Sequence, residues 1–502
     1  MANVVTNDLS RASDLDDHGE QPPKEECGVF GVWAPGEEVS KLTYFGLFAL
    51  QHRGQEAAGI AVGDGERVVV FKDIGLVSQV FDETSLEALQ GDIAIGHTRY
   101  ATTGSADWNN VQPIFGVAPD GTDIALCHNG NLINSAELLV EAQEYGLIRG
   151  DACTSDTNIL VTLLAKEVDE NTSVFDAARK IMPRLEGAFC FTFTDGKTLY
   201  AARDPHGVRP LALGRLERGW VVASETCALD IVGASFVREI EPGEMVAIDA
   251  AGVHSERFAP ATHKGCVFEY VYLARPDSVI RGRDVYSSRV EIGRRLAREH
   301  PVDADLVIPV PDSGTPAAVG YASECGIPFG QGLVKNAYVG RTFIQPSQTL
   351  RQLGIRLKLN PLRDMIEGKR LIVVDDSIVR GNTQRALIRM LREAGAAEVH
   401  VRIASPPVKW PCFYGIDFAS PGELIANSGS PGGESEVIEA VCTAIGADTL
   451  GFLSLGDMIE ATEQLPQDLC AACFDGHYPL GLPQLNKNAD LVRRLQGTTT
   501  GE

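Results

Sequence analysis

Short apolar-rich runs of the length of β-strands dominate the hydrophobic pattern from Cys27 to about residue 260. Eight apolar-rich runs bounded by Gly, Asp or Asn predict β-strands at 27–33, 66–71, 92–100, 123–130, 187–193, 198–203, 220–225 and 243–248. Helical periodicity falls between them, at 38–51, 134–146, 154–168 and 174–184. Many strands with few helices predict stacked sheets flanked by helices, an α+β layered domain.

The pattern changes near residue 265, where strands begin to alternate with helices. Helical periodicity is found at 284–300, 315–326 and 384–395, and apolar strand runs at 304–314, 369–383 and 397–405. This alternation is typical of a parallel sheet with helices on both faces, an α/β fold. Two domains also suit a chain of 502 residues, which is too long for one ordinary core.

The two ends of the chain carry no such pattern. Residues 1–26 are polar and acidic and predict a disordered segment, so ordered sequence begins at Cys27, and a polar tail begins near residue 487. The acidic start is unlike a secretory signal or a transit peptide, and no apolar run is long enough to span a membrane. We therefore expect a cytoplasmic protein whose eleven cysteines are thiols, metal ligands or catalysts rather than disulfides.

The formal charge of −24 disfavours nucleic acid as a partner, because phosphate backbones are bound by Lys and Arg. Small phosphorylated substrates remain possible, since they need only a local pocket of N–H groups and a few cations.

The sharpest local motif is LIVVDDSIVRGNT at 371–383, an apolar strand followed by two carboxylates and a loop. Ligands bind beyond the carboxyl ends of parallel strands, and Gly381 lets the backbone approach an anion there. N–H groups at the start of the next helix add positive potential, and Thr383 and Ser377 offer hydroxyls. The segment predicts a phosphate-binding loop.

Asp375 and Asp376 stand where a phosphate would repel them, so we expect them to face sugar hydroxyls, Mg²⁺ or both. The alternative is an Asp pair that only caps the following loop and helix. This motif resembles the phosphoribosyl pyrophosphate signature of type I phosphoribosyltransferases at all of its defining positions.

Two further segments suit an anion site. PVPDSGT at 309–315 follows a strand, and its Ser313 can reach a metal or a pyrophosphate, although a plain β-to-α turn would be favoured if the segment stood alone. The loop 335–351 carries Lys335 and Arg341 in an acidic protein and suits an anion lid, with a solvated surface loop as the alternative.

The first domain offers the parts of an amino-acid site. Arg99 suits a bidentate grip on a carboxylate, and Asp156 can hold an α-ammonium group. Asn129 and Gly130 provide a side-chain amide and an N–H, as an oxyanion hole requires. Cys27 alone would be read as a core thiol, but beside these residues it becomes a candidate nucleophile.

ECGVFG, ALQHRGQEAAGIA at 49–61, GHTRYATTG, HNG and SDT resemble the glutaminase domain of N-terminal-nucleophile amidotransferases. In that family the nucleophile is the first residue of the mature chain, and its α-amine is the general base. The pKa of an α-amine, about 7.7–8.0, suits this task. The resemblance therefore implies that residues 1–26 are a propeptide removed between Glu26 and Cys27.

Over about 25–485 the chain resembles the amidophosphoribosyltransferase family. The resemblance implies a glutaminase domain at 27–262 and a phosphoribosyltransferase domain at 263–486, between the propeptide 1–26 and the tail 487–502. It also implies that ammonia released from glutamine at Cys27 displaces pyrophosphate from phosphoribosyl pyrophosphate. The product would be 5-phosphoribosylamine, in the first committed step of purine biosynthesis.

Site roles follow from the same resemblance. Mg²⁺ would lie on Ser313, Asp375 and Asp376, and Tyr338 would line the lid or ammonia passage. Phosphoribosyl pyrophosphate would contact Asp375, Asp376, Ser377, Arg380, Gly381, Asn382, Thr383, Lys335 and Arg341. The family further implies a homotetramer with feedback inhibition by purine nucleotides.

Four cysteines form a candidate metal centre. Cys470-x-x-Cys473 alone could be zinc, redox or neither, but Cys266 and Cys412 complete a set of four. These positions resemble the ligands of a structural [4Fe–4S] cluster in one subclass of the family, and Zn²⁺ is the alternative metal. Apart from Cys27, the six other cysteines (127, 153, 190, 227, 325 and 442) are expected to be core residues.

Two competing interpretations belong to other classes. One is a regulatory protein that binds phosphoribosyl pyrophosphate without turnover, which would not need Cys27, Asn129 and Asp156 together. The other is a glutaminase with a degenerate second domain, which the intact 371–383 motif disfavours.

Overall fold

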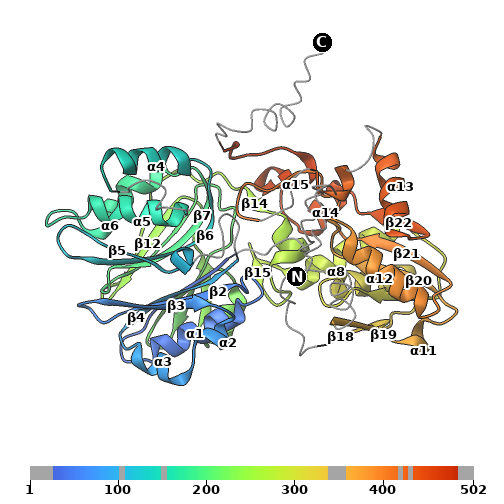
Figure 1. The fold of residues 1–502 in the computed structure, drawn as a ribbon, viewed down its shortest axis with the longest axis horizontal. Coiled ribbons are helices and arrows are strands. Elements are labelled where there is room, and N and C mark those ends of the chain that lie inside the picture. The colour runs from blue at the N-terminus through green and yellow to red at the C-terminus, as the bar shows by residue number, and fades with distance from the viewer. Residues whose placement is uncertain are drawn as a thin grey trace, which may run out of the picture.

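The structure is a computed structural model that describes residues 27–100, 108–147, 155–336, 358–416, 422–427 and 433–483. The leader 1–26, the tail 487–502 and most of the lid 335–351 lie outside these residues. The chain folds into two halves that lie side by side, one drawn in blue and green and the other in yellow and orange (Figure 1).

Two antiparallel sheets build the first half. The larger has the strand order β11 (Ser235–Glu239), β9 (Ala212–Leu216), β10 (Gly219–Ala223), β1 (Gly28–Trp33), β4 (Ile93–Arg99), β2 (Ala57–Gly63), β3 (Val68–Ile74). The smaller has the order β13 (Gly252–Arg257), β12 (Glu244–Asp249), β8 (Leu199–Arg203), β7 (Gly187–Thr194), β6 (Asp123–Leu132), β5 (Ile114–Val117). A core that includes Val29, Ile95 and Cys127 joins the two sheets face to face.

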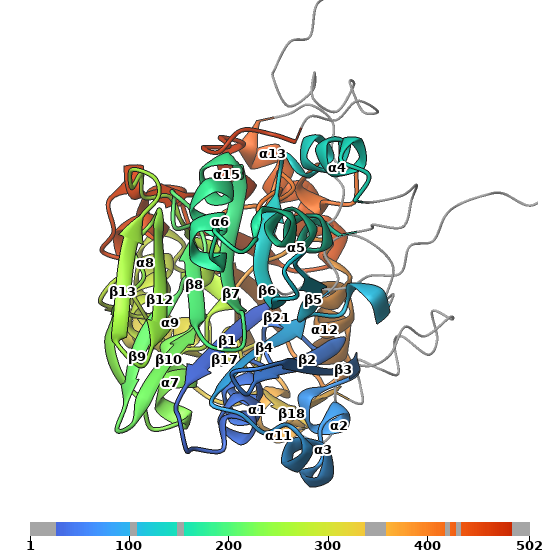
Figure 2. The same cartoon turned by 90° about the vertical axis from the view of Figure 1, so that its left-hand side faces the viewer.

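Helices cover the two outer faces of this pair of sheets (Figures 1 and 2). Beside the larger sheet lie α1 (Val39–Ala49), α2 (Val77–Val80), α3 (Glu83–Ala88) and α7 (Thr226–Ile231). Beside the smaller lie α4 (Ser135–Glu144), α5 (Asp156–Glu167) and α6 (Val174–Ile181), with short 3₁₀ turns η1 (Trp108–Asn110) and η2 (Met182–Arg184) nearby. The half is therefore a helix–sheet–sheet–helix sandwich, as the α+β prediction required.

All eight predicted strands and all four predicted helices of this half are present. The strands β2, β5, β9, β11 and β13 were not predicted. β2 is fully buried and built from AAGIAVG, in which small residues replace the usual β-branched ones. β13 is largely exposed, so GVHSER carries no apolar run to mark it.

The second half has a four-stranded parallel sheet in the order β17 (Leu306–Pro309), β20 (Arg370–Asp375), β21 (Glu398–Ile403), β22 (Thr449–Phe452). Along β20, Ile372 and Val374 face the core shared with α8 (Val285–Glu299) and α9 (Thr315–Cys325). Leu371 and Val373 face the opposite core, shared with α12 (Asn382–Glu393) and α13 (Glu434–Ile445). Helices on both faces confirm the predicted α/β fold.

Shorter elements complete this half. A small antiparallel pair is formed by β18 (Leu333–Lys335) and β19 (Leu359–Pro361), and another by β15 (Val279–Ile280) and β16 (Arg283–Asp284). The remaining pieces are α11 (Arg363–Ile366), α14 (Leu455–Ala461), α15 (Ala472–Asp475), η4 (Ile425–Asn427) and η5 (Pro466–Asp468). Within the described ranges, no helix is both long enough and apolar enough to cross a membrane.

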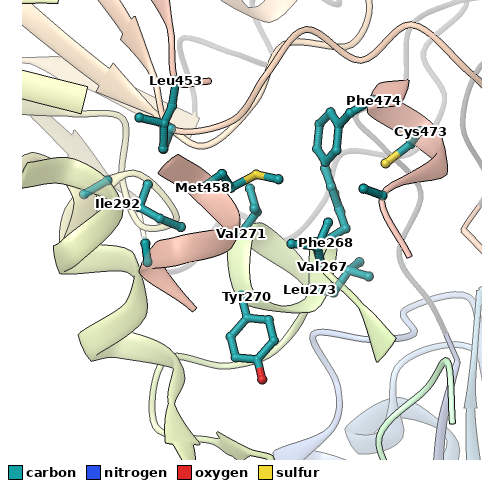
Figure 3. Close-up of a cluster of buried hydrophobic side chains, with 14 of the residues drawn as sticks. Val267, Phe268, Tyr270, Val271, Leu273, Ile292, Leu453, Met458, Cys473 and Phe474 are labelled. Atoms are coloured by element: carbon teal, nitrogen blue, oxygen red, sulfur yellow. The ribbon is translucent and has the colours of Figure 1, made fainter. Parts of the chain in front are cut away.

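The C-terminal segment returns to the junction between the halves. There β23 (Leu469–Cys470) pairs in parallel with β14 (Gly265–Cys266), and η3 (Glu269–Leu273) follows as one π-helical stretch. Phe268 packs on Phe474 of α15 with ring centroids 6.0 Å apart (Figure 3). The junction is therefore built by chain segments about 200 residues apart in sequence.

Candidate active sites and metal centre

Cys27 lies at the start of β1, beside the end of β4. Gly28 pairs with Thr98, which places Cys27 next to Arg99 across the sheet. The thiol donates to the carbonyl oxygen of Tyr100 at 3.6 Å. Although Cys27 keeps some exposed surface, burial raises the pKa of its thiol, while the Arg99 and Arg53 charges lower it and Asp156 raises it. Arg99, the predicted ligand of the substrate carboxylate, and Asp156, the predicted ligand of its ammonium group, are therefore both close enough to affect the thiol electrostatically.

Asn129 and Gly130 lie near the end of β6. Cys127 of the same strand is close enough to Cys27 that the charge of Cys27 raises the pKa of the Cys127 thiol. Asn129 is 1% exposed, and its Nδ2 has no hydrogen-bond partner among the described residues. Gly130 has φ +140°, and a Cβ there would lie 2.0 Å from the carbonyl oxygen of Ala188, so only glycine fits. An unpaired amide donor in a dry pocket is what an oxyanion hole needs.

Asp156 is the first residue of α5, directly after the N-cap Ser155. Its carboxylate accepts from the N–H of Leu132 at 3.1 Å and of Thr157 at 2.7 Å, and lies 3.5 Å from Nδ1 of His128. Burial alone would raise the pKa of Asp156, but the His128 charge and these N–H donors lower it overall. The carboxylate stays ionised and suits an ammonium ligand.

Asp375 is the last residue of β20 and Asp376 follows it, and the two are 7% and 6% exposed. Gln384 donates to Asp375, and Ser377 donates to Asp376 at 2.5 Å. Ser313 also hydrogen-bonds the Asp376 carboxylate, so the structure brings the predicted metal ligands together. Burial raises the pKa of both carboxyls, and the charge of Asp376 raises that of Asp375 further.

The helix after this pair starts at Gly381 rather than at an aspartate. Gly381 is the N-cap of α12 with φ +82°, and a Cβ would lie 2.4 Å from Cδ1 of Ile425. The part of the alternative in which Asp375 and Asp376 cap this helix is therefore wrong, while the two carboxylates do accept from Asp376 N–H and the Ser377 hydroxyl in the following loop. Asn382 and Thr383 form its first turn, so the predicted anion-binding N–H groups lie just beyond the carboxylates.

The cations predicted around this site are only partly described. Arg380 pairs with Glu423 at 3.1 Å. Lys335 ends β18 and contacts Asp312 at 2.6 Å, which places it beside the loop of Ser313. Tyr338 and Arg341 lie outside the described residues.

Cys266, Cys412, Cys470 and Cys473 line one cavity, together with Val208, Arg209, Tyr414, Ile416, Ala472 and Tyr478. Burial raises the pKa of Cys266 to about 11 and also raises those of Cys470 and Cys473, and neighbouring thiols add to each increase. Across the described ranges, no three His, Cys, Asp or Glu side chains converge as a site for a single metal ion. The four predicted cysteines thus surround a common space.

The other cysteines divide into two groups. Cys127, Cys190 and Cys227 are buried as expected, whereas Cys325 and Cys442 are only half-buried, because each lies near the end of a surface helix. Cys153 is outside the described residues.

Sequence reasoning missed a buried ion-pair network between the halves. Arg53 is 1% exposed and contacts Glu225 at 2.6 Å and Glu269 at 2.8 Å. Glu269 also lies 3.6 Å from Arg209. The sequence offered one signal, since Arg53 belongs to the ALQHRGQEAAGIA run, but its partners come from unrelated segments.

Sequence comparisons identify both halves. A glutamine amidotransferase domain model matches residues 97–230, and a phosphoribosyl transferase domain model matches residues 288–404. The amidophosphoribosyltransferase of Mycobacterium tuberculosis is 67% identical over 499 residues, covering 96% of this chain and 94% of the relative. This chain belongs to the amidophosphoribosyltransferase family. It is therefore an enzyme, and both competing interpretations are wrong.

More distant relatives agree with this assignment. The amidophosphoribosyltransferase of Bacillus subtilis is 47% identical and covers 92% of this chain and 95% of the relative. A solved structure of the glutamine phosphoribosylpyrophosphate amidotransferase from B. subtilis, complexed with ADP and GMP, aligns with a TM-score of 0.83 at 46% identity. It covers 91% of this chain and 98% of that one. The family shares the two-domain fold described above.

Proposed function

We propose that this chain, by its family a glutamine-dependent phosphoribosyl pyrophosphate amidotransferase of purine biosynthesis, divides its reaction between the two sites described above. The observation that carries the proposal is a shielded thiol with its amino-acid pocket at Cys27 and a buried carboxylate pair at the end of β20, in one chain. The domains are 27–262 and 263–486, and the enzyme works in the cytoplasm.

Glutamine is hydrolysed in the first site. Arg99 binds the substrate carboxylate and Asp156 binds its ammonium group. The α-amine of Cys27 takes the thiol proton while the sulfur attacks the side-chain amide carbon, and the carbonyl electron pair moves to an oxygen held by Asn129 and Gly130. The carbon–nitrogen bond then breaks, ammonia leaves with a proton from the α-amine of Cys27, and water releases glutamate from the thioester. An α-amine at this position requires removal of residues 1–26.

Ammonia is consumed in the second site. Its lone pair attacks C1 of the ribose while the bond from C1 to the pyrophosphate oxygen breaks. The new C1–nitrogen group then gives one proton to the released pyrophosphate, which leaves 5-phosphoribosylamine. Loop N–H groups at 377–383, with Arg380 and Lys335, hold the phosphates, and Tyr338 and Arg341 close the passage. The buried carboxyls of Asp375 and Asp376, both with raised pKa values, and the Ser313 hydroxyl, which hydrogen-bonds Asp376, fit Mg²⁺. The ion would screen the leaving pyrophosphate.

The four cysteines fit a [4Fe–4S] cluster. A cluster needs its thiolates spaced around a common cavity, as Cys266, Cys412, Cys470 and Cys473 are, and its iron would offset the cost of burying their charge. A single Zn²⁺, with Zn–S bonds of about 2.3 Å, requires the four sulfurs to converge. The cluster would clamp the C-terminal segment onto the junction without transferring electrons. Iron analysis with visible absorption spectroscopy distinguishes it from zinc.

Assembly and regulation follow the family. We expect a homotetramer that purine nucleotides inhibit, in keeping with the ADP and GMP bound to the B. subtilis enzyme. Size-exclusion chromatography with light scattering and inhibition assays with AMP, ADP and GMP test these two points.

The mechanism is tested by intact-mass measurement and by Cys27→Ala. We expect a mature chain that begins at Cys27 and releases glutamate and pyrophosphate in equal amounts. Cys27→Ala should lose glutamine-dependent synthesis but keep synthesis from added ammonia, because the second site is untouched. Glutamate release by Cys27→Ala, or full activity of a chain that retains 1–26, would contradict the proposal.

A further inference from the structure

We propose that the segment 412–415, which contains the cavity residue Cys412, positions the oxyanion hole of the glutaminase site, and that Asn131 and Arg209 are the positioning residues. The inference rests on the proposed roles of Cys27 and Gly130. It adds that the wall of the cysteine cavity supports glutamine hydrolysis through contacts between the two halves of the chain.

The first contact is made by β6, the strand that carries Asn129 and Gly130. Nδ2 of Asn131 donates to the carbonyl oxygen of Phe413 at 2.9 Å, across 282 positions of sequence. Gly415 has φ +117°, and a Cβ there would lie 3.1 Å from Cα and 3.2 Å from the carbonyl carbon of Gly130. The two glycines are therefore in close backbone contact, and a shift of the segment moves Gly130.

The second contact runs through Arg209, which is fully buried. Its Nε and Nη2 donate to the carbonyl oxygen of Tyr414 at 3.2 Å and 2.9 Å. The N–H of Tyr414 in turn donates to the Cys412 sulfur at 3.4 Å. Arg209 itself lines the cysteine cavity, so the cavity wall and the segment 412–415 are held by the same guanidinium.

The same network reaches the nucleophile. Arg209 lies 3.6 Å from Glu269, and Glu269 pairs with Arg53 at 2.8 Å. Nε of Arg53 donates to the backbone carbonyl of Cys27 at 3.3 Å. Because Gly130 and Cys27 are both tied to one cavity wall, filling that cavity fixes the distance between the thiol and the oxyanion donors.

This coupling matters because oxyanion donors act only in the right geometry. A misplacement of about 1 Å lowers a rate by about 100-fold. Groups that act on the developing oxyanion change kcat rather than KM. Displacing 412–415 should therefore lower kcat for glutamine hydrolysis, while glutamine binding and the transferase site remain intact.

Asn131→Ala and Gly415→Ala test the inference in the full-length enzyme. The probe is the γ-semialdehyde of glutamate, whose carbon accepts the Cys27 sulfur while the thiol proton is released and the aldehyde oxygen becomes an oxyanion. We expect the aldehyde affinity and the glutaminase kcat to fall together, by about tenfold or more. The rate of Cys27 alkylation by iodoacetamide, which needs no oxyanion hole, and ammonia-dependent synthesis should stay near wild type.

Gly252→Ala is the matched control, because Gly252 has φ +114° but no described atom within 4 Å of an added Cβ. It should keep wild-type aldehyde affinity. Wild-type enzyme depleted of its cavity metal by chelation should lose aldehyde affinity as Asn131→Ala does. Unchanged aldehyde affinity in both variants, or an equal loss of iodoacetamide reactivity, overturns the inference. A wild-type enzyme that never binds the aldehyde contradicts the proposed role of Cys27 instead.

Discussion

Two buried carboxyls in this enzyme have opposite pKa shifts, and the difference suits their proposed ligands. The pKa of Asp156 is lowered, because His128 and two backbone N–H groups outweigh the effect of burial. The pKa of Asp375 is raised well above its usual value by burial and by the neighbouring Asp376. Asp156 is thus already ionised and ready to bind an ammonium group. In the Asp375–Asp376 pair, by contrast, a bound cation would relieve the repulsion between the two carboxylates.

Asp375→Asn should stabilise the enzyme at neutral pH in the absence of Mg²⁺. The folded pKa of Asp375 lies above the unfolded value of about 3.9, so the native state binds more protons and its stability falls as pH rises between the two values. Removing the charge should raise the free energy of unfolding at pH 7 by on the order of 1 kcal/mol. Gln384, whose Oε1 has no partner among the described residues, can turn to accept from the new amide. Urea denaturation at several pH values measures the effect.

Asp305→Asn is a control in which the expected change in stability has the opposite sign. Hydrogen bonds from Arg370 lower the pKa of Asp305 to about 2, so its contribution is present above the unfolded pKa and is lost as pH falls. This variant should be less stable at pH 7 than wild type. If Asp375→Asn loses stability in the same way, the carboxylate pair carries no repulsion. Stabilisation by Mg²⁺ with phosphoribosyl pyrophosphate should disappear only in Asp375→Asn.

At the level of elements, sequence patterns predicted most of the fold because buried strands and amphipathic helices leave local periodic signals. The motif 371–383 could also be recognised in the sequence, since one strand, one loop and one helix start carry the carboxylate pair and the adjacent N–H groups. Strands such as β2 and β13 were missed, because small residues and exposed positions leave no apolar run. Contacts such as Asn131 with Phe413 could not be predicted, because only the folded chain brings residues 282 positions apart together.

The start of α12 gives a prediction at this scale. Gly381→Ala and Gly446→Ala place a Cβ at nearly equal φ, +82° and +79°, but only the Cβ at Gly381 has described neighbours, Ile425 and Ile445, within 4 Å. Gly446→Ala should lower the free energy of unfolding by about 1 kcal/mol, because alanine is strained in the left-handed backbone conformation. Gly381→Ala should cost more and raise KM for phosphoribosyl pyrophosphate, because the loop must move. Denaturation and steady-state kinetics measure both, and equal effects on KM would contradict a role for Gly381 in the phosphate loop.

For the whole molecule, the two halves are joined by buried charge as well as by apolar packing. Arg53 and Glu225 belong to the first half, and Glu269 begins the π-helical stretch that enters the second. Glu225 also accepts from Ser278 at 2.6 Å and from the N–H of Arg275 at 2.8 Å. These side chains are out of water, so losing one member leaves an uncompensated charge at the junction.

Glu269→Gln should therefore destabilise the junction and weaken glutamine hydrolysis together. Breaking a buried ion pair typically costs about 3–5 kcal/mol, and the lower end is expected because Arg53 keeps Glu225. Arg53 also holds the Cys27 carbonyl, so glutaminase kcat should fall while ammonia-dependent synthesis persists. Glu324→Gln is the control, since its pair with Arg298 is exposed and should leave the urea midpoint unchanged. Equal midpoints for the two variants would mean that the network does not hold the halves together, and unchanged glutaminase kcat in Glu269→Gln would mean that it does not position Cys27.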